Sequence, residues 1–501
     1  MKFRIDEIVA ATGGRLALGK PGASVSALVT DTRTLAAGQG FLALRGEQFD
    51  GHNFLDAAVK RGASALIIDR EDLLAGLNPT LRGGEKGAAP VSGCLETGAV
   101  PFSHVAKGTV PFSQEREKGT APFAVVLVRN TETALADLGR AARARLTCPV
   151  IAVTGSCGKT TVKEMIGQIL GPRMRGKTPP ASYNNQIGVP LTLLAAETDD
   201  QFVLCEFGTN HPGEIAHLAD IGRPTVAIVT VVAEVHLEGL ISLDGVAAEK
   251  RAIVEAVSPE GLAILNADDP RVAAFGPKCR GRVLTVGLHA RADLRAKSFA
   301  QSEAGLRFTA DGVAFEIPVL GEHQVVLALA AAAAAREVGM PPAESADALR
   351  KFHPPKMRLA IQNAGDVKIL NDAYNANPRS IKAALSLLPI WPDRRKVVFF
   401  GDMRELGAAS RAAHEELGRV IAGAGVAQLV CVGTESEATA RAAVAAGMKT
   451  DAVATFSDSQ AAAKAANGFV RGGDVVLVKG SRLIRMEEVV EALAAGRGAL
   501  A

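Results

Sequence analysis

Aromatic residues, net charge and closely spaced cysteines are all scarce in this chain. Phe, Tyr and Trp make up 4% of the 501 residues, which leaves little surface on which nucleic-acid bases could stack. The 56 Lys and Arg residues nearly balance the 53 Asp and Glu residues, so the formal net charge is only +3. Proteins that bind nucleic acids usually carry a strong positive patch. We therefore expect no nucleic-acid partner.

Signals for secretion, membrane insertion and metal clusters are missing as well. Residues 1–7 include acids where a signal peptide needs an apolar stretch. The longest apolar run, residues 325–335, is shorter than the ~18 residues that a membrane span needs. The six cysteines are scattered without a CxxC pair, a pattern typical of free thiols in a reducing compartment. The sequence thus predicts a cytoplasmic protein without a membrane span.

A glycine-rich turn links a short apolar run to an amphipathic segment at residues 150–170. The apolar side chains after the turn recur at the spacing of one buried helix face, at Val162, Met165, Ile166, Ile169 and Leu170. Strand, glycine turn and helix in this order surround a phosphate with backbone N–H groups, while a lysine reaches the terminal phosphates. We therefore predict a nucleoside triphosphate site at Gly155, Ser156, Cys157, Gly158, Lys159, Thr160 and Thr161. Val153 stands where the GxxxxGK[ST] pattern has its first glycine. The alternative to a nucleotide site is therefore a plain strand-to-helix turn with a surface lysine.

Strand-like and helix-like segments alternate along most of the chain, which is typical of parallel, doubly wound sheets. His353-Pro354-Pro355 reads as a linker. We predict an α/β fold of three domains, at residues 1–129, 130–352 and 353–501. The expected domains are a small N-terminal α/β substrate domain, a central parallel-sheet ATPase domain that holds the P-loop, and a C-terminal Rossmann-like domain.

One segment interrupts this alternation. A Gly-x-x-Pro-Phe sequence recurs at residues 98–102, 108–112 and 119–123, with Gly and Pro where a strand or helix needs neither. We predict that residues 79–122 form a disordered insertion of the first domain, because this composition cannot bury a core. A substrate-binding arm is the alternative.

Two polar residues follow apolar, strand-like runs near the P-loop. Glu206 ends the run at residues 202–206, and His236 comes shortly after the run at residues 226–232. Ligands of open α/β sheets bind beyond the carboxyl ends of strands, so we expect both side chains to converge on the P-loop. Glu206 would suit Mg²⁺ there. A helix-capping acid and a polar loop histidine are the alternatives.

Residues 154–160 resemble the P-loop of the Mur ligases, ATP-dependent ligases that build the peptidoglycan stem peptide, and of folylpolyglutamate synthases. Further segments are similar to the Mur ligases that add D-alanyl-D-alanine, at residues 184–192, 208–215, 236–239, 374–378, 401–407 and 479–488. The Tyr-Asn-Ala-Asn-Pro segment at 374–378 is the most specific, since relatives usually carry a His-containing version. The resemblance covers nearly the whole chain apart from the insertion.

The resemblance implies a role for each matched residue. ATP is expected at the P-loop, Arg358 and Asp372. Mg²⁺ is expected at Thr160, Glu206, His236 and Lys250, with Lys250 carbamylated by CO₂, and Lys159, Lys250 and His236 are the implied catalytic residues. The implied substrate-binding residues are Asp31, Thr32, Arg33, Asn184, Asn185, Tyr374, Asn375 and Asn377. From its own sequence context, Lys250 would be an ordinary exposed helix lysine.

The chain departs from the family pattern at two places. Where the family has His-Asn and then a second Asn, this chain has His323-Gln324 and Leu327, so the adenine contact is in doubt and Gln324 is the candidate substitute. The acid pair before Tyr374 has become Asn371-Asp372, which leaves one carboxylate.

The resemblance implies a monomeric amide ligase whose partners are small-molecule substrates. The terminal carboxylate of UDP-N-acetylmuramoyl-tripeptide would attack the γ-phosphate of ATP. The amine of D-alanyl-D-alanine would then displace phosphate from the resulting acyl phosphate, with ATP and Mg²⁺ as cofactors. Folylpolyglutamate synthase and the ligase that adds the third amino acid are the rival enzymes, and an ATP-regulated switch is the non-enzymatic one. Diaminopimelate and lysine both stay open for the third stem residue.

Overall fold

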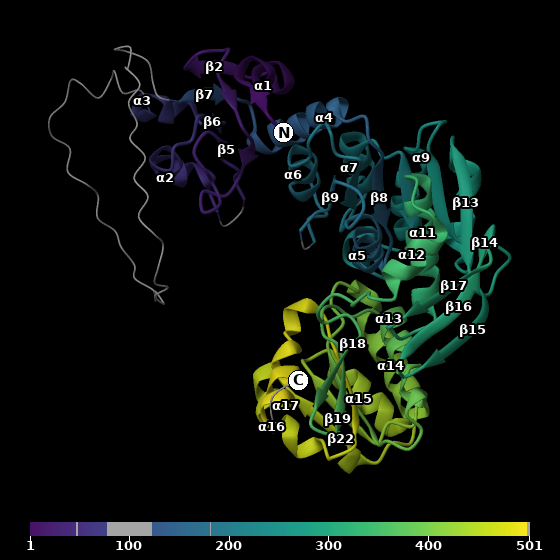
Figure 1. Ribbon diagram of the computed structural model, residues 1–501. Helices are drawn as coiled ribbons and strands as arrows, with labels where there is room; N and C mark the ends of the chain where they lie inside the picture. The colour runs from purple at the N-terminus through teal and green to yellow at the C-terminus, as the bar shows by residue number, and fades with distance from the viewer. Residues whose placement is uncertain (47–48, 78–122, 181, 498–501) are drawn as a thin grey trace, which may run out of the picture. The chain divides into compact units, whose positions relative to one another are not determined.

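The computed structural model describes residues 1–46, 49–77, 123–180 and 182–497 (Figure 1). These residues form two compact units, Met1–Leu138 and Gly139–Ala501. The insertion predicted at residues 79–122 lies outside the described residues. Within the described ranges, no helix combines the length and the apolar character that a membrane crossing requires.

The first unit is built on a five-stranded sheet in the order β2-β7-β6-β5-β4. Its strands are β2 (Arg15–Leu18), β4 (Leu28–Val29), β5 (Gly40–Leu42), β6 (Ala65–Ile68) and β7 (Ala124–Leu127). Only β2 runs antiparallel to its neighbour. A short pair, β1 (Phe3–Arg4) and β3 (Ser24–Val25), and the helices α1 (Ile5–Thr12), α2 (Leu55–Lys60) and α3 (Leu74–Leu77) complete it, and α4 (Thr131–Arg145) starts within it. This is the small α/β domain expected from the sequence.

A seven-stranded, wholly parallel sheet begins the second unit, in the order β14-β13-β12-β11-β8-β10-β9. Its strands are β8 (Val150–Thr154), β9 (Gly176–Lys177), β10 (Phe202–Glu206), β11 (Val226–Val229), β12 (Leu262–Asn266), β13 (Arg282–Gly287) and β14 (Leu294–Arg295). The residues of β8, β10, β11 and β12 are all buried, as expected for strands covered on both faces. Because β10 and β11 flank β8 on opposite sides, the loop after β8 opens at a switch point of the sheet, where ligands bind.

The helices of this region include the amphipathic segment expected after the P-loop. They are α5 (Lys159–Leu170), α6 (Gly188–Leu194), α7 (Glu214–Gly222), α8 (Leu237–Leu240), α9 (Leu243–Glu255), α10 (Pro270–Ala273), α11 (His323–Glu337) and α12 (Pro342–Leu349). In α5, the five predicted apolar positions are at most 2% exposed, which confirms the predicted buried face. The strand expected at residues 226–232 is shorter, because beyond Val229 the backbone bonds to the P-loop: Ser156 N donates to Val231 O at 2.8 Å.

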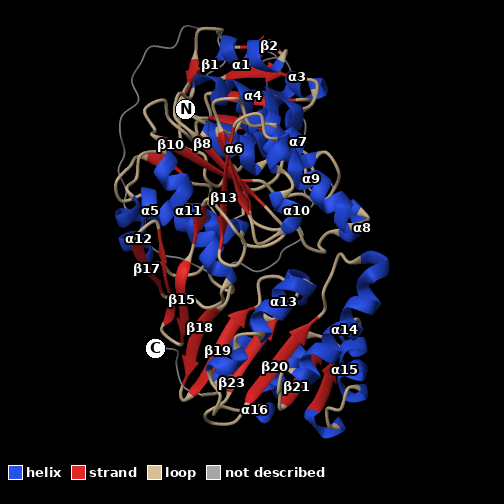
Figure 2. Cartoon of the chain, turned by 90° about the vertical axis from the view of Figure 1, so that its right-hand side faces the viewer, coloured by secondary structure: helices blue, strands red, loops and turns tan. Residues whose placement is uncertain are grey.

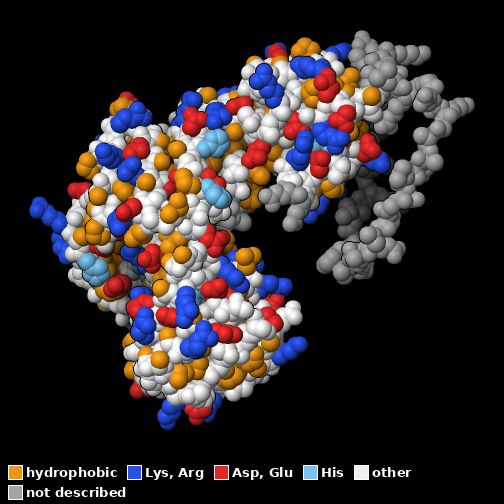
Figure 3. Space-filling view, turned by 180° about the vertical axis from the view of Figure 1, so that it is seen from behind, with side chains coloured by type: hydrophobic (Ala, Val, Ile, Leu, Met, Phe, Trp, Pro, Cys, Tyr) orange, Lys and Arg blue, Asp and Glu red, His pale blue; other side chains and the backbone are white. Residues whose placement is uncertain are grey.

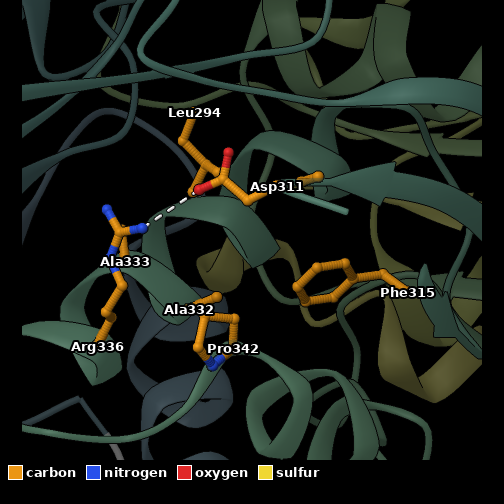
Figure 4. A pocket seen from close by; sticks show the side chains of 8 residues that line it. Leu294, Asp311, Phe315, Ala332, Ala333, Arg336 and Pro342 are labelled. Carbon is orange, nitrogen blue, oxygen red and sulfur yellow. Dashed lines mark hydrogen bonds and ion pairs between the residues drawn. The ribbon is translucent and has the colours of Figure 1, made fainter. Parts of the chain in front are cut away.

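A small antiparallel sheet of β15 (Lys297–Ser302), β16 (Gly305–Ala310) and β17 (Val313–Ile317) packs with α11 and α12. A narrow pocket remains there, walled by alanine methyl groups of α11 and by Phe315 (Figure 4). Its polar rim is one ion pair, between Arg336 and Asp311 at 3.2 Å. Since both charges are already paired, the pocket is a packing gap beneath the hairpin.

The C-terminal part has a six-stranded sheet in the order β18-β19-β23-β20-β21-β22 (Figure 2). Its strands are β18 (Ala360–Ala364), β19 (Val367–Asp372), β20 (Lys396–Gly401), β21 (Gln428–Val432), β22 (Val453–Phe456) and β23 (Val475–Lys479). Only β18 is antiparallel. Its helices are α13 (Pro378–Leu385), α14 (Ser410–Gly423), α15 (Ser436–Ala445), α16 (Ser459–Phe469) and α17 (Glu487–Ala495).

Alternate residues of β20 reach opposite faces of this sheet. Val398 and Phe400 join the apolar cluster under α13, α14 and α15, whereas Val397 and Phe399 join the cluster under α16 and α17. Helices therefore cover both faces, which is the doubly wound, Rossmann-like arrangement predicted from the sequence. On the side seen in Figure 3, Lys and Arg are interspersed with Asp and Glu over the described residues.

Candidate nucleotide and ligase site

Two glycines shape the P-loop between β8 and α5. Gly155 has a φ of 146°, and a Cβ there would overlap the hydroxyl of Thr230. Gly158, with a φ of 83°, precedes α5, and a Cβ there would come within 2.9 Å of the Leu327 methyls. Because no side chain at Gly158 caps α5, the first N–H groups of this helix stay free for an anion. The loop is thus built as a phosphate cradle.

Glu206, at the end of β10, lies beside the P-loop with both carboxylate oxygens bonded. Thr160 Oγ1 donates to Glu206 Oε2 at 2.9 Å, and Asn184 Nδ2 donates to Oε1 at 3.1 Å. The carboxylate is 1% exposed. Helix α7 starts at Glu214 behind Gly213, so Glu206 does not cap it. The predicted convergence of Glu206 on the P-loop is confirmed.

Two lysines, Lys159 and Lys250, interact with each other at the P-loop, and Lys159 also interacts with the Glu206 carboxylate. The Lys159 ammonium donates to Gly155 O at 2.8 Å. Burial lowers the pKa of Lys159, and the Glu206 carboxylate opposes that shift. Lys250, in α9, is 1% exposed, so the alternative of an ordinary exposed lysine is wrong. Burial, and next the positive charge of Lys159, lower the pKa of Lys250 to about 7. Lys250 is therefore poised to react as a neutral amine.

Glu249, the neighbour of Lys250, ties α9 to the Gly208–Ile215 segment. Its carboxylate accepts from Gly213 N at 2.7 Å and from Ile215 N at 2.6 Å, at the start of α7. Thr209 Oγ1 adds a third bond at 3.3 Å. This explains in physical terms why the segment before α7 carries glycine and threonine: its backbone wraps a buried acid.

His236 lies just before α8, in a left-handed conformation with φ 53°. Its Nδ1 is 2.5 Å from Glu405 Oε2, a close polar contact whose angles fall outside those of a hydrogen bond. The His236 ring lowers the pKa of Glu405. Upstream of His236, Ser156 Oγ donates to Ala233 O at 3.1 Å, so the segment that leads to His236 is fastened to the P-loop.

The C-terminal part contributes a buried ion pair and an aromatic contact. Lys479 Nζ, at the end of β23, lies 2.5 Å from Asp372 Oδ2, at the end of β19. Burial raises the pKa of Asp372, and Lys479 opposes that shift. The Arg358 guanidinium lies 4.0 Å above the Tyr374 ring. The Tyr374 hydroxyl is 2.9 Å from Ser182 Oγ, which belongs to the same loop as Asn184.

Asn377 and Asn375 have different environments, although both belong to the Tyr374 segment. Asn377 Nδ2 lies 3.1 Å from the thiol of Cys157, and Asn377 Oδ1 accepts from Ser380 N, which caps α13. Asn375 is exposed, and its carbonyl accepts from Lys479 at 2.9 Å. Of these two asparagines, Asn377 is the one whose side chain contacts the P-loop.

The helix α11 approaches the P-loop where the family has its two asparagines. Leu327 packs against Gly158, as the close Cβ position shows. Gln324 is 5% exposed, and its Oε1 has no hydrogen-bond partner among the described residues. The substitution of Gln324 for an adenine contact stays a prediction.

The other residues predicted to bind substrate make hydrogen bonds or ion pairs with residues close to them in the chain. Asn185 Oδ1 accepts from Gly188 N at 3.0 Å, at the start of α6. In the first unit, Asp31 and Arg33 form an ion pair with three side-chain hydrogen bonds and a shortest distance of 2.7 Å, and Thr32 is buried beside them. They follow β4, at the carboxyl edge of the sheet. Their contribution to a substrate site stays a prediction.

A divalent cation fits the donor set around the P-loop. Thr160 and Glu206 present oxygen ligands, which Mg²⁺ prefers. Among the described residues, no group of three or more His, Cys, Asp and Glu side chains forms a cage for a metal ion. A site with few protein ligands suits Mg²⁺, which is usually held by one or two carboxylates together with nucleotide phosphates.

Sequence reasoning missed several residues that organise the site. Lys479 and Glu405 lie in segments that resemble the family, but their partners Asp372 and His236 are far away in the chain. Arg379, which bonds Asp269 Oδ2 at 3.1 Å, carried no signal at all. Lys479 could have been found from its position, because it is a charged residue at the end of a strand-like run.

Three models of Mur ligase domains match this chain. The Mur ligase family catalytic domain matches residues 24–143, the Mur ligase middle domain residues 153–335, and the glutamate ligase domain residues 357–482. The chain is 32% identical to the UDP-N-acetylmuramoyl-tripeptide–D-alanyl-D-alanine ligase of Bacillus subtilis, over 94% of this chain and 93% of that protein. It is also 32% identical to the ligase of the same name from Escherichia coli, over 94% of both chains.

Solved structures share the whole architecture. A crystal structure of MurF from Acinetobacter baumannii superposes with a TM-score of 0.82, at 27% identity and 99% coverage of both chains. MurF ligase from Thermotoga maritima in complex with ADP has the same fold, with a TM-score of 0.74 over 94% of this chain and 97% of that one, at 24% identity. With full-length relatives above 30% identity and three matching domain models, the chain belongs to the Mur ligase family.

Proposed function

We propose that this chain is the ATP-dependent ligase that joins D-alanyl-D-alanine to the terminal carboxylate of UDP-N-acetylmuramoyl-tripeptide. The single observation that carries the proposal is the grouping of a phosphate cradle and the Thr160–Glu206 pair at the carboxyl ends of β8 and β10 with the buried Lys250, which feels the charge of Lys159. The full-length relatives that bear this activity in their names support it.

The first half of the reaction is phosphoryl transfer to a carboxylate. The P-loop N–H groups and Lys159 would bind the terminal phosphates of ATP, which places the γ-phosphorus in reach of the substrate carboxylate. Attack by a carboxylate oxygen releases ADP and leaves an acyl phosphate. The reaction needs charge neutralisation more than a protein nucleophile, and Lys159 supplies a positive charge in a desolvated place.

The second half forms the amide. The amine of D-alanyl-D-alanine attacks the activated carbonyl, and phosphate leaves from the tetrahedral intermediate. Asn184, Asn185, Tyr374, Asn375 and Asn377 would hold the muramyl peptide and the dipeptide, while Arg358, Asp372 and Gln324 would contact the nucleotide. Asp31, Thr32 and Arg33 would bind the UDP portion from the first domain. We keep the boundaries 1–129, 130–352 and 353–501 for the three proposed domains.

Mg²⁺ would be held by Thr160, Glu206, His236 and the carbamate of Lys250, and when bound it would neutralise charge on the phosphates. Thr160 and Glu206 already hold each other in place. Burial keeps a large fraction of Lys250 neutral near pH 7, and a neutral amine is what captures CO₂. We further propose that the protein works as a monomer in the cytoplasm, where its product serves cell-wall synthesis and hence cell shape and division.

A phosphate-release assay tests the proposal. Wild-type protein with ATP and Mg²⁺ should release phosphate rapidly only when UDP-N-acetylmuramoyl-tripeptide and D-alanyl-D-alanine are both present. Lysine or diaminopimelate with the UDP-linked dipeptide, and glutamate with a folate, test the rival ligases. Lys159→Ala should lower turnover by roughly 10²-fold, as the loss of a preorganised charge-stabilising group does. Equal phosphate release without either substrate would contradict a ligase and favour an ATP-regulated switch.

A further inference from the structure

Two residues in strained backbone conformations face each other where α8 meets the loop after β20. His236 has φ 53° and Glu405 has φ 66°, both in the left-handed region that non-glycine residues rarely occupy. Their side chains approach to 2.5 Å between Nδ1 and Oε2. Left-handed residues of this kind concentrate at functional sites, where the surrounding structure holds them in place. The pair therefore calls for a reason beyond packing.

The loop that carries Glu405 is held at three points. Asp402 is fully buried, and its Oδ1 accepts from Ser436 N at 2.8 Å, at the start of α15. His414, also fully buried, accepts from Met403 N at 3.1 Å through Nε2. Arg404 N donates to Ser481 Oγ at 2.9 Å. These hydrogen bonds hold three consecutive residues, Asp402, Met403 and Arg404, and so fix the backbone from which Glu405 extends.

The short helix after His236 is anchored to the same loop. Leu237 packs against the apolar cluster of the C-terminal sheet, which includes Leu406. Glu238 N donates to Glu405 O at 3.4 Å. Gly407, with φ 54°, lies close enough to Glu238 that a Cβ would meet its Cγ at 3.4 Å. Residues on both sides of His236 and Glu405 thus fix the distance between the two side chains.

We infer that Glu405 is a positioning residue that the C-terminal domain supplies to His236, orienting its ring so that Nε2 is presented to the ligase site. A carboxylate opposite Nδ1 keeps the ring proton at Nδ1 and leaves the lone pair on Nε2. The inference rests on the proposed role of His236. It adds that this role requires the C-terminal domain to be docked on α8, because the orienting carboxylate comes from that domain.

The alternative for Glu405 is a surface ion pair with no effect on chemistry. Such pairs contribute little, and the Glu405 side chain is 48% exposed. A surface ion pair, however, does not explain why two left-handed residues meet. It also does not explain why the buried Asp402 and His414 hold the loop that carries Glu405 in place. In the intact pair the Nδ1 atom is buried, and the Glu405 carboxylate is the group that lies against it.

The experiment compares Glu405→Ala, Glu405→Gln and the control Glu415→Ala in the full chain. Glu415 is a half-exposed acid of the same domain, paired with Arg411 at 2.9 Å. Glu405→Ala should lower kcat about 10- to 100-fold, the loss typical when the partner of a ligating histidine is removed, with the KM for ATP nearly unchanged. Glu405→Gln should recover most of kcat, because its amide oxygen can take the place of the carboxylate oxygen beside Nδ1. Glu415→Ala should equal wild type.

A second measurement is independent of turnover. Ring ¹⁵N shifts of ligand-free protein, with His236 assigned through His236→Gln, report which nitrogen carries the proton. In the neutral ring, wild type should carry the proton on Nδ1, and Glu405→Ala should move a large fraction of it to Nε2. A double-mutant cycle completes the test: in a His236→Ala background, Glu405→Ala should have no further effect on kcat.

The outcomes separate this inference from the proposed function. Wild-type kcat in Glu405→Ala, beside an impaired His236→Ala, would overturn the inference alone. So would an unchanged proton position, or an equal loss from Glu405→Ala in both backgrounds. Full activity of His236→Ala would overturn the role of His236 in the proposed function, and this inference with it.

Discussion

The thiol of Cys157 in the P-loop lies 3.1 Å from the side-chain amide of Asn377, which begins α13 of the C-terminal sheet. A residue of the phosphate cradle and a residue of the Tyr-Asn-Ala-Asn-Pro segment, 220 positions apart, are therefore in contact. Nucleotide bound in the cradle would meet both. Chemical modification of the Cys157 thiol should therefore respond to nucleotide bound in the cradle.

We expect N-ethylmaleimide to inactivate the protein through Cys157. Among the described residues, Cys148, Cys205 and Cys431 are buried, whereas Cys157 and Cys279 are partly accessible, and of these two Cys157 lies in the P-loop. ATP with Mg²⁺ should slow the inactivation at least about fivefold, because phosphates in the cradle block approach to the thiol. Peptide mapping of the labelled protein gives the site. Cys157→Ala should resist the reagent, and loss of ATP protection in wild type would place the nucleotide elsewhere.

Activity should depend on CO₂ through Lys250. Burial lowers the pKa of Lys250 to about 7, so the neutral amine that forms a carbamate grows as pH rises through about 7. In CO₂-depleted buffer, turnover should fall, and added bicarbonate should restore it, more completely at pH values above 7. Lys250→Ala should be inactive and insensitive to bicarbonate. Stopped-flow phosphate release measures both.

The lowered pKa of Lys250 also determines how the free energy of unfolding changes with pH. Without carbamate, the unfolded chain binds a proton at Lys250 up to its ordinary pKa of 10.5, while the folded chain loses it near 7. Since the unfolded state then binds more protons, this group makes the folded state more stable as pH rises from about 7 to 10.5. Lys250→Met should flatten that part of the stability–pH curve in urea titrations. An unchanged slope would contradict the assigned burial.

Removing one member of the Lys479–Asp372 pair should destabilise the C-terminal sheet strongly. Lys479 is 3% exposed, so Asp372 without it is a buried charge lacking its partner. Lys479→Met should lower the free energy of unfolding by about 3–5 kcal/mol. Lys479→Met combined with Asp372→Leu should recover a large part of that loss. Denaturant titration followed by circular dichroism measures the two variants, and equal losses would argue against the buried-charge explanation.

Ile241→Gly should stabilise the protein. Ile241 has φ 67° and is 83% exposed, and Ser242 N donates to Leu240 O at 2.7 Å, which makes Ile241 the centre of a strained γ-turn. A β-branched residue is badly suited to this conformation, and relief of the strain should exceed the entropy cost of glycine, for a gain of about 1 kcal/mol. Ile241→Ala, which keeps the positive φ on a side chain, is the matched control. A gain equal to that of glycine would show that exposure of the isoleucine, rather than strain, was the cause.

The Gly-Pro-Phe repeats should be dispensable for ligation. They stand between α3, which ends at Leu77, and β7, which begins at Ala124, and β7 pairs in parallel with β6. Replacing residues 82–120 by a short Gly/Ser linker should leave turnover within about threefold, because loop length adds little closure entropy. A many-fold rise of the KM for the UDP-linked substrate, with ATP binding intact, would instead identify a substrate-binding arm.

The sequence by itself determined the features that depend on neighbouring residues. The P-loop, the buried face of α5 and the runs that became β8 and β10 are local, because periodicity and glycine placement are set within a dozen residues. For the same reason the α/β class and the approach of Glu206 to the P-loop could be predicted from strand ends.

Only the tertiary structure decided which distant side chains meet. Lys250 looked like an exposed helix lysine and is buried, because the packing of α9 against α7 and β11 has no signature within α9 itself. Glu405 and Lys479 have recognisable roles only because they contact His236 and Asp372, which are more than 100 residues away in the chain. Desolvation and ion pairing depend on three-dimensional neighbours, so charge states such as that of Lys250 follow from the fold and not from the order of residues.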